Sequence, residues 1–287
     1  MKLLSFGEVL WDVYPDEKYI GGAPLNFAAH ANKNGLEAYM VSAIGNDDLR
    51  EDTLNCLKQW HVNSDYVAVL EDYVTGKCLV SLNEQGIPSY NLLSDVAYDY
   101  IPVPILQEDF DVLYFGTLSL RSNYNLNSLK TLMSQNSFKE IFVDVNIRAP
   151  HYSKESIQLA FCFATMIKIS DEELPVVLDA LNLGDAGSLA LTAKKIQEAY
   201  SNLKLVLITC GEKGSLVYVK DEGIYTCEAK KTQVVSTVGA GDSFSATFLA
   251  KYLQASTIQD CLETASKVSA YVVSQAGAIP EYDLENL

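Results

Sequence analysis

Short apolar runs alternate with longer helical stretches along most of the chain. The apolar runs lie at residues 3–9, 39–44, 112–116, 141–145, 166–169, 205–209 and 215–219. Several of them are apolar almost throughout, which is typical of strands that helices cover on both faces. The pattern therefore predicts a sheet whose strands are buried on both sides.

The helical stretches lie between these runs, at residues 24–34, 47–60, 189–200, 240–253 and 258–274. The first has Pro24 near its start and Gly35 just past its end, and the second begins with acidic residues. Strands that alternate with helices indicate a doubly wound α/β fold, with a largely parallel sheet and helices on both faces. We expect one domain that spans residues 1–287.

Two segments interrupt the alternation, at about residues 11–20 and 74–100. The first is short and strand-like, and the second contains an apolar run at 76–82, a turn around 84–86 and a polar, aromatic stretch. We expect extra antiparallel strands here, which form a small sheet outside the main one. Such a sheet can act as a lid over an active site. The alternatives are an edge extension and a contact between two copies, and a homodimer formed through the lid would unite two of these roles.

Composition and charge restrict the partners. The chain has 287 residues, of which 48% are hydrophobic, and that is enough to form a sizeable core. Its formal net charge of -16 repels the phosphate backbone of nucleic acid and gives no attraction to anionic lipid. We therefore expect neither nucleic acid nor a membrane as partner. A phosphate-bearing small molecule remains compatible, because N–H groups at a helix N-terminus bind anions without positive side chains.

The sequence also indicates a cytoplasmic location. It begins with MKLLSFG and shows no long apolar segment followed by a cleavage site, and no uncharged apolar run approaches the length of a membrane span. The six cysteines are scattered, with no CxxC pair and no histidine at ligand spacing. We expect reduced thiols rather than a zinc site or a disulfide framework.

The strongest chemical signal is the sequence STVGAGDSF at residues 236–244. It follows a β-like run at 233–235 and opens a stretch that we expect to be an amphipathic helix. The glycines allow a tight turn, so that the N–H groups of Gly239, Ala240 and Gly241 face an anion at the positive end of the helix. Asp242 is well placed to take a proton from an attacking hydroxyl. Taken alone, the segment would be better interpreted as a glycine turn with Asp242 as an ordinary acidic residue of a first helical turn.

This segment resembles the C-terminal signature of the ribokinase-like, or PfkB, carbohydrate kinases. The resemblance implies that Asp242 is the catalytic base and that Gly239, Ala240 and Gly241 form the anion hole for the transferred phosphoryl group. It extends over nearly the whole chain and implies the fold as well: a doubly wound α/β domain with a small β-sheet lid.

A second signature of the same family is present as GGAPLNFA at residues 21–28. The resemblance implies that Asp12, Gly21, Gly22 and Asn26 hold the hydroxyls of a sugar. Carboxylate and amide side chains suit this role because together they supply the acceptors and donors that a polyol needs. Without the motif, Asp12 would be an ordinary turn residue and Asn26 an amide on a helix surface.

Further matches imply a nucleotide site, at TCGEKG (209–214), KISDEEL (168–174) and AGA (276–278). The nucleotide-binding residues that the resemblance implies are Lys168, Ser170, Glu173, Thr209, Gly211, Gly214 and Gly277. In this family the glutamate at the position of Glu173 helps to organise Mg²⁺ and phosphate. We expect Mg²⁺ to arrive with ATP, held mostly by phosphates and water, so no all-protein metal cage is required.

Two positions depart from the family pattern. Ser236 stands where relatives usually have an aspartate that helps to hold an activating monovalent cation, so a requirement for K⁺ does not carry over. Ser170 stands where the family often has asparagine, which weakens the local match to the Mg²⁺–phosphate site but leaves Glu173 in place. Neither change removes the implied base.

The sequences GEVLWD (7–12) and DVNIR (144–148) resemble the fructokinase branch, and the second also occurs in kinases of acidic keto-sugars. Fructose is therefore the first expected acceptor, and 2-keto-3-deoxygluconate, ribose and other ketoses are the alternatives. Arg148 has two interpretations. It clamps a carboxylate or phosphate of the substrate, or it is a structural arginine at the end of a strand.

Rival enzyme classes lack their motifs. A Rossmann dehydrogenase needs GxGxxG after an early strand, and a P-loop kinase needs GxxxxGK[ST]; neither occurs. A non-catalytic relative that binds a sugar is the remaining alternative. Asp242 and the Gly-Ala-Gly turn argue against it, whereas Ser236 and Ser170 keep it open.

Overall fold

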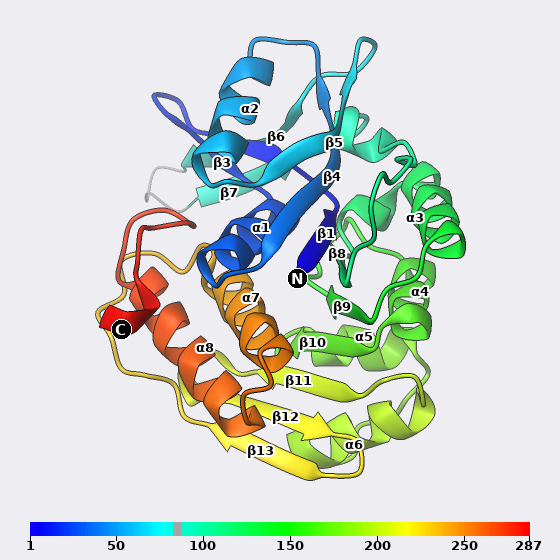
Figure 1. Cartoon of the computed structure of the whole chain (residues 1–287), viewed down its shortest axis with the longest axis vertical. Coiled ribbons are helices and arrows are strands. Elements are labelled where there is room, and N and C mark those ends of the chain that lie inside the picture. The colour runs from blue at the N-terminus through cyan, green and yellow to red at the C-terminus, as the bar shows by residue number, and fades with distance from the viewer. Residues whose placement is uncertain (83–87) are drawn as a thin grey trace.

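The computed structural model describes residues 1–82 and 88–287, so the turn expected at 84–86 lies outside the described residues. A nine-stranded sheet runs through the molecule in the order β13-β12-β11-β10-β9-β8-β1-β4-β5 (Figure 1). Its strands are β1 (Lys2–Phe6), β4 (Glu37–Gly45), β5 (Asn63–Leu70), β8 (Val112–Gly116), β9 (Glu140–Asp144), β10 (Met166–Ser170), β11 (Leu205–Thr209), β12 (Ser215–Val219) and β13 (Gly223–Cys227). Every pair from β11 to β5 is parallel, and β12 and β13 continue the sheet antiparallel.

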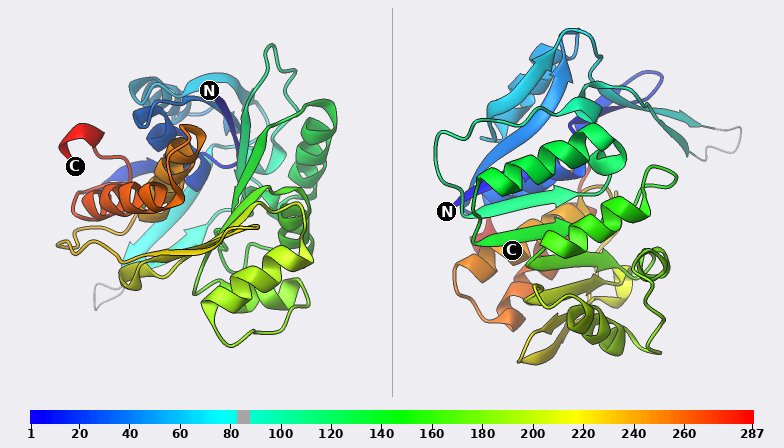
Figure 2. Two further views of the ribbon diagram at one scale, coloured as in Figure 1. Left: turned by 60° about the horizontal axis from the view of Figure 1, so that its bottom comes forward. Right: turned by 90° about the vertical axis from the view of Figure 1, so that its right-hand side faces the viewer.

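Helices cover both faces of this sheet (Figure 2). They are α1 (Ala23–Lys33), α2 (Arg50–Gln59), α3 (Asn123–Gln135), α4 (Lys154–Phe163), α5 (Leu174–Ala180), α6 (Leu189–Ala199), α7 (Ala240–Leu253) and α8 (Ile258–Val273). Short 3₁₀ turns are η1 (Ala97–Tyr100), η2 (Ser119–Arg121), η3 (Gly211–Lys213) and η4 (Leu284–Asn286). Side chains of α1, α2, α7 and α8 join one core cluster, and those of α3 to α6 join another.

The first strand, β1, is buried on both faces from Leu3 to Phe6. Leu3 packs into the core under α1 and α7, whereas Leu4 and Phe6 pack into the core under α3 and α4. Successive side chains of a strand point to opposite faces, so a strand between two helical layers buries all of them. The expected α/β architecture, with helices on both faces of a largely parallel sheet, is confirmed.

A second, four-stranded sheet lies beside the carboxyl edge of the first, in the order β3-β2-β6-β7. Its strands are β2 (Leu10–Val13), β3 (Lys18–Gly21), β6 (Gly76–Leu82) and β7 (Pro88–Leu92). The expectation of purely antiparallel strands is wrong, because β2 and β6 pair in parallel. In the sequence, β2 follows β1 and β6 follows β5. Because β1 and β5 run in the same direction, both segments leave the main sheet with the same orientation.

Several local predictions also need correction. The helix expected from residue 47 begins at Arg50, because the Asp47 carboxylate instead accepts hydrogen bonds from the main chain of Leu49 and Thr75 in a turn. The run at 233–235 is not a strand, and Val234 and Val235 are exposed there. The helix α7 is not amphipathic, since residues 243–250 are all buried between the sheet and neighbouring helices. The elements β5, β13, α3, α4 and α5 were not identified.

Candidate active site

The polar residues singled out in the sequence gather at the carboxyl edge of the parallel strands. Asp144 and Ser170 are the last residues of β9 and β10, and Glu8 follows β1. The α7 helix points its first turn at the same edge. In open α/β sheets, ligands bind in the crevice outside the carboxyl ends of the strands. The fold therefore places these side chains where a small-molecule site is expected.

Asp242 lies in the first turn of α7 and contacts the helix α1. The Asn26 amide Nδ2 donates a hydrogen bond to Asp242 Oδ2 over 2.8 Å, although the two residues are 216 positions apart in sequence. Burial raises the pKa of Asp242, and the Asn26 amide, the Lys168 ammonium and Arg148 oppose that rise. A partly desolvated carboxylate that is held by one amide is suited to accept a proton.

Gly239 sets the geometry of the turn that precedes α7. It is the N-cap residue, with φ of 79° in the left-handed region. A Cβ at this position would lie 2.4 Å from the carbonyl oxygen of Ala278, so a side chain has no room. Glycine is therefore required here on both conformational and steric grounds. The Ala240 N–H donates to the Thr237 carbonyl over 3.3 Å within this turn, and α7, a 14-residue helix, has its positive end here.

A buried ion pair lies beneath this turn. Lys168 Nζ is 3.1 Å from Asp144 Oδ1, and the Ser245 hydroxyl donates to Asp144 Oδ2 over 3.2 Å. Burial raises the pKa of Asp144 to about 6, with Lys168 opposing. Burial lowers the pKa of Lys168, but Asp144 and Glu173 more than compensate, so its net pKa rises. A Cβ on Gly241 would lie 3.4 Å from Lys168 Nζ, which places this ammonium next to the anion-facing turn.

Glu173 joins two strand ends through their main chains. Its Oε1 accepts the N–H of Ile147 over 2.6 Å, and its Oε2 accepts the N–H of Ser170 over 2.7 Å. The Ser170 hydroxyl in turn accepts the Glu173 N–H at 3.3 Å. The carboxylate therefore fixes the loop after β9 to the end of β10, directly beside the Lys168–Asp144 pair.

The remaining residues of the expected nucleotide site follow neighbouring elements. Thr209 ends β11 and lies opposite Ser170 in the sheet register. In the next turn, Gly211 and Gly214 have positive φ values of 53° and 102°, and a Cβ on Gly214 would lie 2.1 Å from the Cys227 carbonyl oxygen. Gly277, with φ of 82°, precedes the Ala278 that packs on Gly239. The structure thus places Thr209 beside Ser170, and the turn at Gly277 against the start of α7.

The expected sugar-binding residues lie on the other side, where the small sheet meets α1. Asp12 is on β2, and a Cβ on Gly21 of β3 would lie 3.4 Å from its Oδ2. Gly22 has φ of 114° and packs against the main chain of Glu8. Burial raises the pKa of Asp12, and the Cys78 thiol and Arg148 oppose it. Arg148 is exposed, and its positive charge opposes the rise in the pKa values of both Asp12 and Asp242.

Glu8 is a site residue to which the sequence reasoning gave no role. Only 2% of it is exposed, and among the described residues its Oε2 has no hydrogen-bond partner. Burial raises its pKa to about 7; main-chain N–H groups, including that of Ala23, and Arg148 oppose the rise. Asn26 Oδ1 is likewise buried and unpartnered. The sequence signal was its position directly after the first buried strand, four residues before Asp12.

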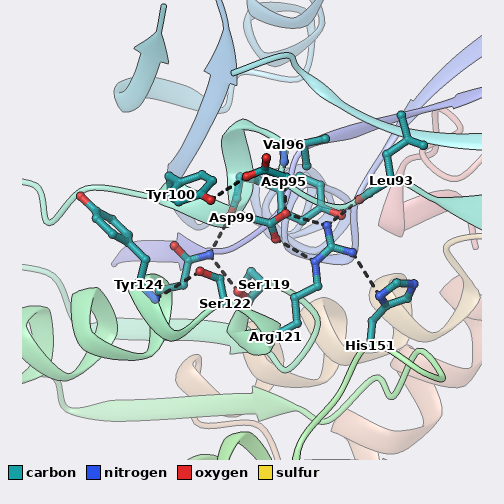
Figure 3. Close-up of polar contacts among 12 residues, drawn as sticks. Leu93, Asp95, Val96, Asp99, Tyr100, Ser119, Arg121, Ser122, Tyr124 and His151 are labelled. Atoms are coloured by element: carbon teal, nitrogen blue, oxygen red, sulfur yellow. Dashed lines mark hydrogen bonds and ion pairs between the residues drawn. The ribbon is translucent and has the colours of Figure 1, made fainter. Parts of the chain in front are cut away.

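An adjacent cluster ties the small sheet to the main one (Figure 3). Arg121 forms a bidentate pair with Asp99, at 2.7 and 2.9 Å, and donates to the Leu93 carbonyl over 2.6 Å. The His151 ring approaches the same guanidinium, at 3.4 Å. These groups border an open cavity of about 440 Å³. Arg121 therefore joins the segment after β8 to the segment after β7.

The described residues contain neither a cluster of metal ligands nor a membrane-spanning helix. No group of three or more His, Cys, Asp and Glu side chains in that part of the chain is arranged to hold a metal ion. Within the same residues, none of the helices has the length and apolarity needed to cross a bilayer. Each of the six cysteines is a free thiol.

The fold and the position of the site define a mixed α/β enzyme of the ribokinase type. The pfkB family carbohydrate kinase model matches residues 3–284, and the chain therefore belongs to the PfkB family of carbohydrate kinases. It is a phosphotransferase that acts on a carbohydrate.

Curated relatives and solved structures agree with this placement. The chain is 27% identical to an ATP-dependent 6-phosphofructokinase of Thermoanaerobacterium thermosaccharolyticum, over 99% of this chain and 95% of that protein. It is 28% identical to "Probable fructokinase-5" of Arabidopsis thaliana, over 97% of this chain and 93% of that protein. A fructokinase of Vibrio cholerae O395, solved with fructose, ADP and calcium, superposes with a TM-score of 0.79 at 21% identity, over 97% of this chain and 94% of that one.

Proposed function

We propose that this protein is an ATP-dependent sugar kinase that transfers the γ-phosphate to a hydroxyl of a small sugar, with fructose as the first expected acceptor. The observation that carries the proposal is the contact between Asn26 and Asp242, 2.8 Å, at the start of α7. It brings a hydroxyl-binding amide and a carboxylate together beside a helix N-terminus. A sugar hydroxyl and a phosphoryl group are the two partners that this pair of features can hold.

In the proposed reaction, Asp242 orients the attacking hydroxyl and accepts its proton. Asn26 holds the carboxylate through Nδ2, and its unpartnered Oδ1 is a ready acceptor for a second sugar hydroxyl. Asp12 supplies a further carboxylate from the small sheet. The oxygen of the acceptor then attacks the γ-phosphorus in line as the bond to ADP breaks.

The turn at Gly239, Ala240 and Gly241 would stabilise the charge of the transferred group. Preorganised N–H groups at a helix N-terminus are effective here because they need no reorganisation during the reaction. Lys168, next to Gly241, adds a fixed positive charge within the same region. Thr209, Gly211, Gly214 and Gly277 are the proposed contacts of the nucleotide on that side.

The oxygen-rich end of β9 and β10 fits a hydrated Mg²⁺ that enters with ATP. The charge of Glu173 adds to the rise in the pKa of Asp144 that burial causes, and Mg²⁺ prefers such oxygen ligands and retains water. When bound, Mg²⁺ would neutralise phosphate charge. Glu173 would orient water on the ion while its oxygens hold the two strand ends.

The small sheet is proposed to act as the lid over the sugar. It carries Asp12 and is joined to the main sheet by Arg121, so its movement would deliver one sugar contact and exclude water. We also propose a single catalytic domain and a cytoplasmic location. The lid would in addition form the contact of a homodimer. The free thiols agree with a reducing compartment.

A coupled ADP-release assay tests the function and the acceptor together. The panel contains fructose, ribose, 2-keto-3-deoxygluconate, glucose, adenosine and, given the named 6-phosphofructokinase relative, fructose 6-phosphate. Each is measured with ATP–Mg²⁺, with and without K⁺. A clear preference for fructose supports the proposal, activity on another sugar moves the acceptor, and a folded protein inactive on every sugar contradicts the proposal.

The base assignment has its own test. Replacing Asp242 by Asn keeps the size of the side chain but removes the proton acceptor. We expect kcat to fall about 100- to 10,000-fold while sugar binding, measured by calorimetry, changes little. A turnover close to that of the wild type would refute Asp242 as the base.

A further inference from the structure

The helix α1 contacts the candidate site through two residues one helical turn apart. Asn26 and His30 are at positions i and i+4, so their side chains share a face of the helix. Asn26 donates to Asp242. His30 was not assigned any role in the sequence, yet it is completely buried.

Both nitrogens of the His30 ring are engaged. Nε2 lies 2.9 Å from the Ala278 carbonyl oxygen, and Nδ1 lies 2.8 Å from the Tyr282 hydroxyl. A carbonyl only accepts, so Nε2 carries the proton and Nδ1 accepts from the Tyr282 O–H. Burial lowers the pKa of His30 to about 4, and the ring is therefore neutral near pH 7. This neutral form satisfies both partners at once.

The Ala278 peptide that His30 holds is the surface against which Gly239 packs. A Cβ on Gly239 would lie 2.4 Å from the Ala278 oxygen and 2.8 Å from its Cα. The same carbonyl thus contacts His30 from one side and the start of the anion-facing turn from the other. Displacing Ala278 would change the support of Gly239 directly.

The segment after Ala278 is fixed to α1 by additional contacts. The Lys33 ammonium forms an ion pair with Glu281 at 2.7 Å and lies 5.7 Å above the Tyr282 ring. Asn34 Nδ2 donates to the Tyr282 hydroxyl over 3.3 Å. Tyr271 of α8 donates its hydroxyl to the Glu281 carbonyl over 3.0 Å. Unlike these contacts at Glu281 and Tyr282, the His30 hydrogen bond is made to the Ala278 carbonyl that touches Gly239.

We propose that His30 is a positioning residue for phosphoryl transfer: through Ala278 it fixes the Gly239 turn, and with Asn26 it makes α1 the element that sets the distance between base and anion hole. This inference rests on the proposed kinase function. Both ends of the reacting pair, the proton acceptor Asp242 and the turn at Gly239, are then held by one face of one helix.

The expected signature is a selective loss of turnover. A displacement of about 1 Å between reacting groups costs on the order of 100-fold in rate, whereas binding of the sugar needs only the acceptor side. Replacing His30 by Leu should therefore lower kcat about 10- to 100-fold and leave the KM for the sugar within about twofold. Replacing His30 by Gln, whose amide can still donate to Ala278, should recover part of the loss.

The experiment compares these variants with Tyr271→Phe, a matched control that removes a hydroxyl contact from the same segment at Glu281. Steady-state kinetics on the acceptor found for the wild type are combined with amide hydrogen exchange at residues 236–241. The inference expects faster exchange and lower kcat in His30→Leu, and neither change in the control. A merely structural role predicts lower thermal stability with unchanged kcat.

Two outcomes would overturn the inference. One is a folded His30→Leu variant with a kcat within about twofold of wild type. The other, which applies if that variant does not fold, is a His30→Asn variant, whose amide is too short to replace Nε2 at Ala278, with kcat lowered and exchange at 236–241 accelerated no more than in Tyr271→Phe. A wild type inactive on the whole panel would instead refute the proposed function, and this inference with it.

Discussion

Glu8 offers a prediction whose size follows from the structure. The carboxyl group is enclosed at the end of β1, and burial raises its pKa from 4.5 to about 7. In the unfolded chain the same group titrates near 4.5. Replacing Glu8 by Gln keeps the shape and removes the titration, so the difference between the two proteins isolates this one ionisation.

The sign follows from proton binding. Between pH 4.5 and 7 the folded state holds a proton on Glu8 that the unfolded state has lost, so the free energy of unfolding of the wild type falls as pH rises through this range. Each pKa unit is worth about 1.4 kcal/mol, so the full effect approaches about 3 kcal/mol. The Gln variant should therefore become more stable relative to wild type by up to that amount between pH 4.5 and 8.

Urea unfolding at intervals between pH 4.5 and 8 measures the difference, with the m-value checked for constancy. The exposed Glu212→Gln variant is the control, and its stability relative to wild type should not change with pH in this way. A gap between Glu8→Gln and wild type that stays constant within about 0.5 kcal/mol would refute the burial argument. If the Glu8→Gln variant instead became less stable relative to wild type as the pH rises, Glu8 would have a partner for its charged form.

Replacing Gly239 by Ala should lower the free energy of unfolding by about 2 kcal/mol or more, because the left-handed φ and the Ala278 carbonyl both oppose a Cβ. Denaturant unfolding measures this loss, and a loss below about 0.5 kcal/mol would contradict the prediction. Replacing Arg121 by Met should cost about 3–5 kcal/mol, because Asp99 is left as a buried unpaired charge. Adding Asp99→Asn should recover part of that loss, and a double variant no more stable than the single one would refute the assignment of the cost to the charge.

The sequence was sufficient for the architecture because the parallel strands are buried on both faces. A run such as 205–208 is apolar at every position only when helices cover it on each side, and it forms all of β11 except the last residue, Thr209. Residues at the ends of such strands must meet at one edge, so the positions of Asp242, Lys168 and Glu173 followed from motif and topology together. The hydrophobic pattern did not identify elements with an exposed face, such as β5, whose residues are half-buried or exposed.

Contacts between residues far apart in the sequence could not be predicted from the local sequence pattern. Nothing in the local pattern around Asn26 indicates that its amide meets Asp242, or that His30 meets Ala278 248 positions later. The parallel pairing of β2 with β6 depends on where β1 and β5 lie in the main sheet. Glu8 lies within GEVLWD (7–12), but that resemblance gave the acid no role, and its significance comes from its burial.

The contacts also separate the parts of the site that are rigid from those that can vary. Asp242, Lys168 and Asp144 are held by α1, α7 and central strands whose side chains are buried, so their spacing is costly to change. Asp12 and Arg148 lie on the small sheet and on an exposed loop. Substitutions there disturb little of the core. We infer that the choice of sugar resides mainly in the small sheet and the loop after β9, whereas phosphoryl transfer resides in the helix α7 and its contacts with α1.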